Sequence, residues 1–261
     1  MNGQDGDRSK KGANREMFAG IAPRYDLINR LMSWGQLPYM SESSSDNRIS
    51  EAQAMRRQIP EVVVSRLPTY LRALALLKSE GVEFISSRGL GARLRMTPAQ
   101  IRKDLSFFGK FGRQGRGYSV SRLHRELQQI LGLDKTWLMA LVGVGRLGRA
   151  ILDYKGFAPE GFKIVAAFEN DPNLIGKKVS GVLIEDIANL ETSLKDKKAD
   201  IAIVAVPSSD AQVVIDKLVK SGIKSVLNYA PICVRVSRGV RLQGIDPVLA
   251  LQGMTFYLAR G

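Results

Sequence analysis

The stretch that decides the fold is Trp137-Leu138-Met139-Ala140-Leu141-Val142-Gly143-Val144-Gly145-Arg146-Leu147-Gly148. It begins with an uninterrupted apolar run, which predicts a buried strand. Glycines then follow in the pattern Gly-x-Gly-x-x-Gly, and the residues after them favour a helix. A glycine turn of this kind, between a strand and a helix, is typical of Rossmann domains that bind dinucleotides.

Each glycine of the turn has its own predicted purpose. Gly143 permits the tight turn, Gly145 leaves room for a pyrophosphate against the backbone, and Gly148 lets the helix pack closely on the strand. The N-terminus of the helix offers free N–H groups to the phosphates. The alternative is a glycine turn that serves sheet packing alone. The other predicted cofactor contacts in the turn are Val144, Leu147 and Arg146, the last as a partner for a base or for the pyrophosphate.

An acidic residue follows at the distance that this interpretation needs. Glu169 ends the next apolar segment, 26 residues after Gly143. A carboxylate at this position accepts hydrogen bonds from the ribose hydroxyls of NAD(H) and repels the 2′-phosphate of NADP(H). The sequence therefore favours NADH and NAD+ as ligands.

The surrounding residues 134–245 alternate between strand and helix patterns. This alternation predicts an α/β fold with a mostly parallel sheet and helices on both faces. Residues 246–261 form a separate C-terminal segment, in which 247–258 is a helix that is apolar on too many sides to lie alone on a surface. It needs a partner to cover it. The predicted strands are 137–142, 163–168, 201–206, 225–228 and 240–242, with a helix at 211–221.

Residues 59–133 read as a smaller helical module with one hairpin. A first helix is expected after Pro60, with Pro68 indicating either a kink or a late start. A second short helix follows Ser86 and Ser87. A third opens at Thr97, a good N-cap, with Gln100 at the capping-box position. Two short helices across a tight turn predict a helix-turn-helix, and the following hairpin makes it a winged helix.

Basic and polar residues on this module indicate a nucleic-acid partner. The chain carries a net charge of +14, and the segment 59–135 holds 14 basic and 6 acidic residues. Residues exposed at the start of the third helix are placed to read base edges, and arginines in the glycine-rich segment 110–118 are placed to enter a minor groove. The alternative is a solvated basic surface. The predicted DNA-contacting residues here are Gln100, Arg102, Lys103, Ser106, Arg113 and Arg116.

The first 58 residues have a different character from the rest of the chain. They are polar and include a serine-rich stretch at 41–47, a composition typical of a linker or a poorly ordered extension. Residues 15–35 resemble the opening of menaquinone and ubiquinone C-methyltransferases, but no glycine-rich S-adenosylmethionine loop follows. We interpret residues 1–39 as a fusion remnant or an over-extended start.

Several functional classes are disfavoured by composition. The chain has one cysteine, Cys233, and one histidine, His124, so a disulfide framework, a metal site and histidine-based catalysis are not expected. No apolar run is long enough to span a membrane, and the N-terminus lacks a signal-peptide core, which favours a cytoplasmic location. An NAD-dependent dehydrogenase or reductase is the alternative function, but no compelling acid–base pair accompanies the glycine turn.

From about residue 59 onward the chain resembles the Rex family of redox-sensing transcriptional repressors. The resemblance rests on several motifs in the family's order: Leu67-Pro68-Thr69-Tyr70-Leu71-Arg72, residues 97–106, Gly115-Arg116-Gly117-Tyr118, the glycine turn, Phe168-Glu169-Asn170-Asp171-Pro172 and Asn228-Tyr229-Ala230-Pro231. It implies a non-enzymatic repressor that binds inverted-repeat operators in double-stranded DNA and is released by NADH, with NAD+ competing. It also implies a homodimer in which each C-terminal helix is swapped onto the partner's Rossmann domain.

The same resemblance implies roles for further residues. Ser86 and Ser87 are expected to contact DNA, and Pro207, Asn228 and Tyr118 are expected to contact the cofactor. Arg72, Tyr118 and Asp246 are expected to form a switch. In it, Asp246 pairs with Arg72 across the dimer in the DNA-binding form and with Tyr118 when NADH is bound. The alternatives are that Tyr118 belongs to the core and that Arg72 is a solvated helix residue.

Overall fold

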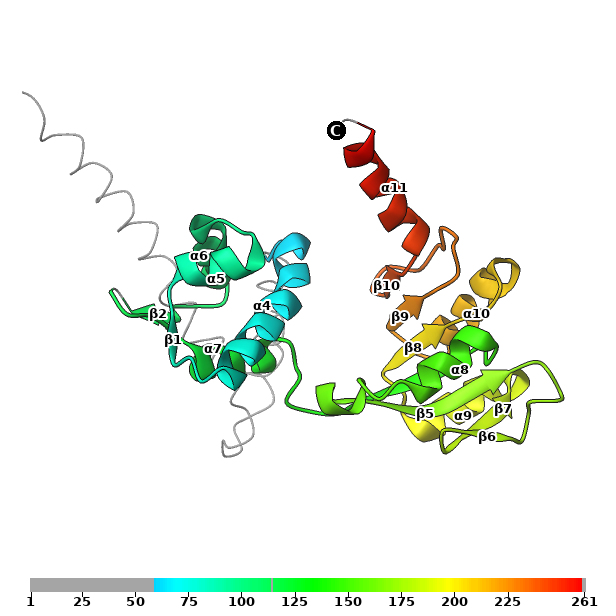
Figure 1. The fold of residues 1–261 in the computed structure, drawn as a ribbon. Helices are drawn as coiled ribbons and strands as arrows, with labels where there is room; N and C mark the ends of the chain where they lie inside the picture. Colours follow the sequence, from blue (N-terminus) through cyan, green and yellow to red (C-terminus); the bar gives the residue numbers. More distant parts are fainter. Residues whose placement is uncertain (1–58, 114, 260–261) are drawn as a thin grey trace, which may run out of the picture. The chain divides into compact units, whose positions relative to one another are not determined.

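The computed structural model describes residues 59–113 and 115–259 (Figure 1). The chain divides into two compact units between Leu133 and Asp134, here called unit 1 and unit 2. The predicted extension at 1–58, with its methyltransferase-like segment, lies outside the described residues. Within those residues, no helix is long and apolar enough to cross a membrane, and His, Cys, Asp and Glu side chains nowhere gather in a group suited to a metal ion.

The described part of unit 1, residues 59–113 and 115–133, consists of four helices and a small antiparallel sheet. In chain order its elements are α4 (Glu61–Ser79), β1 (Phe84–Ile85), α5 (Ser87–Leu94), α6 (Pro98–Ser106), β2 (Gly112–Arg113), β3 (Gly117–Ser119) and α7 (Val120–Ile130). The strands pair in the order β1-β3-β2. Helices α5 and α6 form the helix-turn-helix and β2–β3 the hairpin wing, so the predicted winged helix is present.

Helix α4 begins at Glu61 and continues through Pro68, so the predicted late start is wrong. Its buried face includes Val63 and Leu67 before the proline and Tyr70 and Leu74 after it. An interior proline costs about 3 kcal/mol. Burial of large side chains on both sides of Pro68 offsets this cost, since each contributes roughly 1.5–3 kcal/mol. Tertiary packing therefore outweighs the local signal.

Unit 2 is a doubly wound α/β domain. Its strands are β4 (Trp137–Val142), β5 (Phe162–Glu169), β6 (Lys178–Val179), β7 (Val182–Asp186), β8 (Ile201–Val204), β9 (Ser225–Asn228) and β10 (Arg241–Gly244). They lie in the order β10-β9-β8-β4-β5-β7-β6, and every pairing except β6–β7 is parallel. The strand order reverses direction between β4 and β8, which is the point where such sheets bind ligands.

Helices cover both faces of this sheet, as Figure 1 shows. They are α8 (Arg146–Asp153), α9 (Leu190–Lys197) and α10 (Ser208–Lys220), with short 3-10 turns at Ala158–Glu160 and Ile187–Asn189. Alternate residues of β4 point to opposite faces. Met139 and Leu141 pack with α8, whereas Ala140 and Val142 pack with α9 and α10. The predicted two-sided sheet is therefore present.

The last helix, α11 (Pro247–Leu258), is the exception to this packing. None of its described residues is buried, and Tyr257 is 77% exposed. Asp246 is its N-cap and accepts a hydrogen bond from the backbone N–H of Val248 at 2.9 Å. The apolar surface on all sides of α11 is uncovered within one chain. The large exposed residues are Val248, Leu249, Leu251, Met254, Phe256, Tyr257 and Leu258.

Candidate functional site

The first candidate site lies where four parallel strands of unit 2 end together. Val142 of β4 pairs with Phe168 of β5 and with Val204 of β8, and Val204 pairs in turn with Asn228 of β9. The residues that follow these pairs therefore meet at one edge of the sheet. Because this edge contains the reversal of strand order, it is the expected ligand site of the fold.

The glycine turn has the geometry that its sequence predicts. Gly143 has φ +92°, and a side chain there would meet the Ala205 carbonyl oxygen at 2.5 Å. A Cβ on Gly148 would lie 2.0 Å from the Gly143 carbonyl oxygen, so the helix is packed against the turn. Gly145 differs, because a Cβ there would meet nothing within 4 Å. The turn thus leaves open space only beside Gly145, at the N-terminus of α8.

Glu169 is hydrogen-bonded to the turn itself, at the residue before Gly145. Its Oε2 accepts a hydrogen bond of 2.7 Å from the N–H of Val144, and its Oε1 accepts one of 2.7 Å from the N–H of Asn170. A third and longer bond of 3.3 Å reaches Oε1 from the N–H of Asp171. These backbone donors hold the carboxylate next to the turn. A carboxylate has about four acceptor sites, so capacity remains for a ribose hydroxyl.

The other predicted cofactor residues are placed unequally. Pro207 is exposed at the start of α10, just beyond β8, and Arg146 and Leu147 are exposed on the first turn of α8. Asn228, in contrast, is only 2% exposed. Its amide donates to the Ala230 carbonyl oxygen and accepts from the Ala230 N–H, both at 3.0 Å. The Asn228 side chain therefore shapes the turn after β9, and its predicted contact with the cofactor stays a prediction.

Sequence reasoning missed one basic residue at this edge. Arg149 donates from Nε to the Val144 carbonyl oxygen at 3.2 Å, which holds the guanidinium group beside the glycine turn. Its position one helical turn after Arg146 was the available signal, because residues three apart on a helix lie on the same side. Arg149 is a second cation next to the space that we assign to phosphates.

The second candidate site is on the helix-turn-helix of unit 1. A hollow of about 640 Å³ lies between the N-termini of α5 and α6. Ser86 caps α5 and Thr97 caps α6 through their side-chain oxygens. Arg102 donates to the Ser87 hydroxyl at 3.0 Å and joins the two helices across the hollow. The lining residues are Ser86, Ser87, Arg88, Thr97, Pro98, Ala99 and Arg102.

Helix N-termini and arginines favour an anion. Arg102 in the middle of α6 and Lys103 in its last turn are exposed, as predicted. The Ser106 hydroxyl donates to the Lys103 carbonyl oxygen at 2.7 Å within the same helix. Arg88, at the start of α5, is a further cation of the hollow that sequence reasoning did not single out. The hollow and α6 together form a surface suited to a polyanion.

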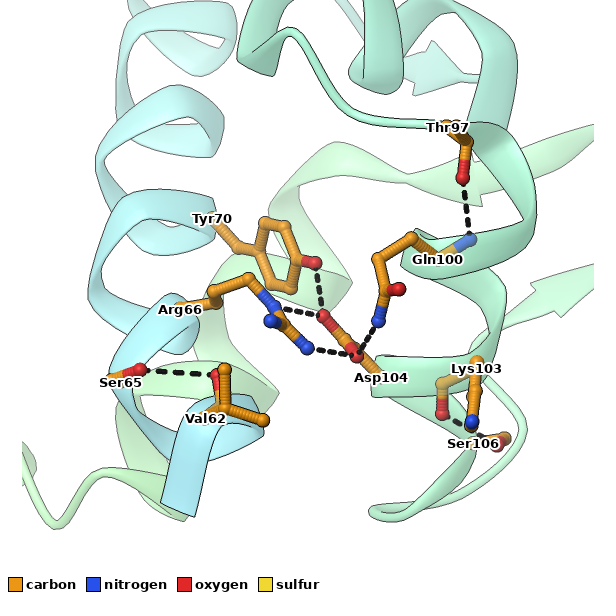
Figure 2. A network of polar contacts seen from close by, with 9 residues as sticks. All are labelled: Val62, Ser65, Arg66, Tyr70, Thr97, Gln100, Lys103, Asp104 and Ser106. Atoms are coloured by element: carbon orange, nitrogen blue, oxygen red, sulfur yellow. Dashed lines mark hydrogen bonds and ion pairs between the residues drawn. The ribbon is translucent and has the colours of Figure 1, made fainter. Parts of the chain in front are cut away.

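A buried carboxylate, Asp104, lies between α4 and α6, as Figure 2 shows. Asp104 is fully buried and receives four hydrogen bonds. Arg66 donates from Nε to Oδ2 at 2.6 Å and from its second nitrogen to Oδ1 at 2.7 Å. The Tyr70 hydroxyl donates to Oδ2 at 2.5 Å, and Gln100 Nε2 donates to Oδ1 at 2.6 Å. The network joins α4 to α6.

These donors determine the charge of Asp104. Burial alone would raise the pKa of its carboxyl group, but the hydrogen bonds from Arg66, Tyr70 and Gln100 hold that pKa below its usual value. Burial, together with the hydrogen bond to Asp104, raises the pKa of Tyr70 well above its usual value, so its hydroxyl stays a donor. Hydrogen bonds to a charged group contribute about 1.5–3 kcal/mol each. Asp104 is therefore a stable anion inside unit 1.

Gln100 does not complete the capping box that its position suggested. Thr97 accepts a hydrogen bond from the Gln100 N–H at 3.1 Å, as predicted, but the Gln100 side chain turns to Asp104. It is half-buried rather than fully outward-facing. The charged acceptor at i+4 outcompetes the cap because a hydrogen bond to a carboxylate is stronger than one to a neutral group.

The wing residues are also partly engaged. Arg113 is exposed at the end of β2, whereas the guanidinium group of Arg116 lies 4.2 Å from the ring centroid of Phe84 on β1. This cation–π contact braces the wing against the sheet. Arg116, predicted to reach into DNA, is thus held against unit 1 in this structure.

Tyr118, predicted to contact the cofactor and to take part in the switch, occupies a core position in this structure. It is 7% exposed and belongs to the hydrophobic core of unit 1 with Leu105 and Phe111. A place in a nucleotide pocket requires the ring to leave that core. Arg72, in contrast, is exposed on α4 and makes no hydrogen bond or ion pair with another described residue. Tyr118 therefore packs in the core here, and its cofactor and switch roles stay predictions.

Known protein families match the sequences of both unit 1 and unit 2. A family model described as "Putative DNA-binding protein N-terminus" matches residues 58–106, and one described as "CoA binding domain" matches residues 134–232. The redox-sensing transcriptional repressor Rex of Chloroflexus aggregans is 48% identical over 203 residues, which cover 78% of this chain and 96% of the relative. The chain belongs to the Rex family of redox-sensing transcriptional repressors. Rex 1 of Thermotoga maritima is 40% identical over 207 residues, covering 79% and 99% of the two chains.

Solved Rex structures resemble both the fold and the order of the two units. RSP, a Rex-family repressor, in complex with beta-NAD+ and operator DNA superposes with a TM-score of 0.75 at 38% identity, covering 77% of this chain and 93% of that one. The complex of RSP with beta-NADH gives a TM-score of 0.72 at 36% identity, covering 78% and 95%. The Rex relatives are named as transcriptional repressors and not as enzymes. The predicted Rex assignment and fold class are therefore confirmed.

Proposed function

We propose that this Rex-family chain senses the ratio of NADH to NAD+ with unit 2 and controls DNA binding by unit 1. The observation that carries the proposal is the open space beside Gly145, bounded by the N-terminus of α8 and by the Glu169 carboxylate. The helix N-terminus suits the pyrophosphate, and the carboxylate suits the adenosine ribose. Arg146 and Arg149 add positive charge beside the phosphates.

Unit 1 supplies the DNA contacts of the proposal. Helix α6 enters the major groove with the base-reading or phosphate-contacting residues Gln100, Arg102, Lys103 and Ser106. The hollow between α5 and α6, with Ser86 and Ser87, holds a backbone phosphate. Arg113 and Arg116 of the wing approach the adjacent minor groove. The partner is a double-stranded operator, and the place of action is the cytoplasm.

A second copy of the chain completes the protein. Helix α11 exposes its large apolar residues on all sides within one chain, and an uncovered helix of this kind needs a partner surface. We assign residues 246–261 to a segment that is swapped onto the other protomer of a homodimer. Two winged helices related by a two-fold axis then match an inverted-repeat operator.

The switch uses charged residues whose positions leave them available. Arg72 is exposed on α4, and Asp246 caps α11 with one oxygen, so its other oxygen can accept a hydrogen bond. In the DNA-binding form the two residues pair across the dimer. With NADH bound, Tyr118 leaves the core of unit 1 and hydrogen-bonds Asp246 in place of Arg72. A ligand shifts an equilibrium only through unequal affinity for two states. A tenfold shift requires about 1.4 kcal/mol, the scale of one charged hydrogen bond.

The proposal is tested by an electrophoretic mobility shift on the upstream region of the native gene. The full chain is titrated in the absence of nucleotide, then with NADH and with NAD+. We expect a retarded complex without nucleotide, its loss with NADH, and competition by NAD+. If neither nucleotide changes the retardation and calorimetry detects no NADH binding, the chain binds DNA but does not sense NADH.

A further inference from the structure

The orientation of the Gln100 side-chain amide is determined by its neighbour. The contact of 2.6 Å joins Gln100 to Asp104 Oδ1, and a carboxylate only accepts hydrogen bonds. The amide nitrogen must therefore face Asp104 and the amide oxygen must face away, as Figure 2 shows. An isolated glutamine has no such restriction, because its amide rotates freely between the two orientations.

Asp104 is itself unable to turn aside. Each of its oxygens accepts two hydrogen bonds, which uses all the acceptor sites of a carboxylate. Arg66 and Tyr70 hold it from α4, and the side chain is fully buried. These four hydrogen bonds hold the Asp104 carboxylate in one position, and a change of its side-chain rotamer would break them.

Gln100 presents a defined pattern on its outer side. Among residues 59–113 and 115–259, none donates a hydrogen bond to its Oε1. One N–H of Nε2 also remains beyond the one given to Asp104. The residue lies in the first turn of α6, next to exposed Arg102 and Lys103. The helix therefore offers an acceptor and a donor side by side, in an order that Asp104 imposes.

We propose that Asp104 is a positioning residue for base recognition, which holds Gln100 so that it reads an adenine in the major groove. The Gln100 oxygen accepts from the exocyclic amine of adenine, and the remaining N–H donates to N7. Guanine carries a keto oxygen where adenine carries the amine. This keto oxygen would face the Gln100 oxygen, and two acceptors cannot form a hydrogen bond. This inference rests on the proposed function, in which α6 reads operator DNA.

The test begins with the full chain and a library of random duplexes, from which the preferred sequence is selected. Each A·T pair of that sequence is then replaced by G·C, and each replacement is measured with the parent chain and with Gln100→Ala. One position in each half-site is expected to lose at least about fivefold in the parent, the lower end of one bidentate contact, and to change little in Gln100→Ala.

The decisive variant is Asp104→Asn, measured at that position of the DNA half-site. An asparagine either donates or accepts, so it no longer dictates which way the Gln100 amide faces. The A·T to G·C penalty is expected to shrink at this position alone, with unchanged affinity for a duplex of unrelated sequence. Tyr70→Phe is the matched control, because it removes a different hydrogen bond to the same carboxylate and keeps the Gln100 contact. It is expected to retain the full penalty.

A measurement on the parent chain covers the case in which Asp104→Asn does not fold. The adenine is replaced by purine, which lacks the exocyclic amine, and separately by 7-deazaadenine, which lacks N7. Both replacements are expected to weaken binding by the parent and to leave Gln100→Ala unaffected. If the parent chain binds the purine-containing DNA as tightly as the adenine-containing DNA, the inference is overturned.

The remaining outcomes separate the inference from the function beneath it. If Gln100→Ala loses the base preference but folded Asp104→Asn keeps it in full, Asp104 does not position Gln100. Base reading by α6 is then still supported. If the parent shows no base preference at any position, α6 does not read DNA. The proposed function then fails and this inference fails with it.

Discussion

The Oε2 oxygen of Glu169 accepts a hydrogen bond of 2.7 Å from the backbone N–H of Val144, so the end of β5 is tied directly to the glycine turn after β4. Two segments that are 25 residues apart in sequence thereby become one site. The carboxylate is held in place by the amides of the turn before any ligand arrives. Preorganisation of this kind reduces the cost of ordering the site on binding.

Replacement of Glu169 is therefore expected to change both affinity and choice of nucleotide. Glu169→Gln removes the charge that repels a 2′-phosphate and weakens the hydrogen bonds to the ribose, each worth about 1.5–3 kcal/mol when the acceptor is charged. We expect NADH affinity to fall by roughly tenfold and the ratio of NADPH to NADH affinity to rise. Calorimetry with both nucleotides measures this. Asp186→Asn, on the neighbouring strand β7, is the control and should leave the ratio unchanged.

Gly145→Val tests the open space directly. A Cβ at this position meets no atom within 4 Å, so the variant is expected to fold, but its side chain fills the place assigned to the pyrophosphate. NADH binding should be lost, and DNA binding should persist and ignore NADH. Gly148→Val is the contrasting variant, because its Cβ would clash with the Gly143 carbonyl oxygen and unfold unit 2. A normal NADH response in Gly145→Val would place the nucleotide elsewhere.

The exposed cations of α6 are expected to carry DNA affinity. The double variant Arg102→Ala and Lys103→Ala should weaken operator binding by about 1–3 kcal/mol for a lost base contact, and lower the salt slope by about 0.9 for each lost phosphate contact. Mobility shifts at several salt concentrations separate the two effects. Lys178→Ala with Lys195→Ala removes the same charge from exposed positions of unit 2 and serves as the control. Equal losses of operator affinity in both double variants would show that only the net charge of the protein matters.

Asp104 predicts a dependence of stability on pH. Its pKa in the folded chain lies below the unfolded value of about 3.9, so its ion pair stabilises unit 1 above that pH and the stabilisation is lost as pH falls through the folded pKa. Asp104→Asn should lower stability at neutral pH by about 2 kcal/mol or more, because it leaves Arg66 without its partner. It should also flatten the loss below about pH 4.

Amide hydrogen exchange of α4 and α6, corrected for intrinsic rates, measures this stability in unit 1 alone. Glu80→Gln breaks the exposed Glu80–Arg93 ion pair of the same unit and is the matched control. A surface pair contributes little, so protection should change only slightly in that variant. Protection in Asp104→Asn that equals the parent at pH 7 contradicts the prediction.

Asp246→Asn tests the switch without damaging α11. Asparagine caps a helix about as well as aspartate, so the helix is retained while the charge that would pair with Arg72 is removed. Operator affinity in the absence of NADH is expected to fall several-fold, and Arg72→Gln should produce the same loss. The double variant should lose no more than either single one, because both remove the same contact. Sedimentation checks that all variants remain dimers, and additive losses would show that the residues do not pair.

Local sequence was sufficient for the features that depend on neighbouring residues. The glycine turn, the strand before it and the Thr97 cap follow from backbone conformation and from contacts within a few positions. Strand–helix alternation likewise predicted the parallel sheet, but the predicted strands omitted β6 and β7, and β8 ends at Val204 rather than at residue 206. These signals are local because the physical terms behind them are local.

Tertiary structure decided the residues whose partners are distant in sequence. Gln100 and Tyr118 have side chains suited to several roles, and only packing shows that one is held by Asp104 and the other lies in the core of unit 1. Pro68 remains in a helix because the core on both sides of it outweighs a local penalty. The sequence by itself determined the fold and the glycine turn, since these depend on pattern and backbone. The assignment of individual polar side chains required the structure, because a hydrogen bond goes to whichever partner the fold brings within reach.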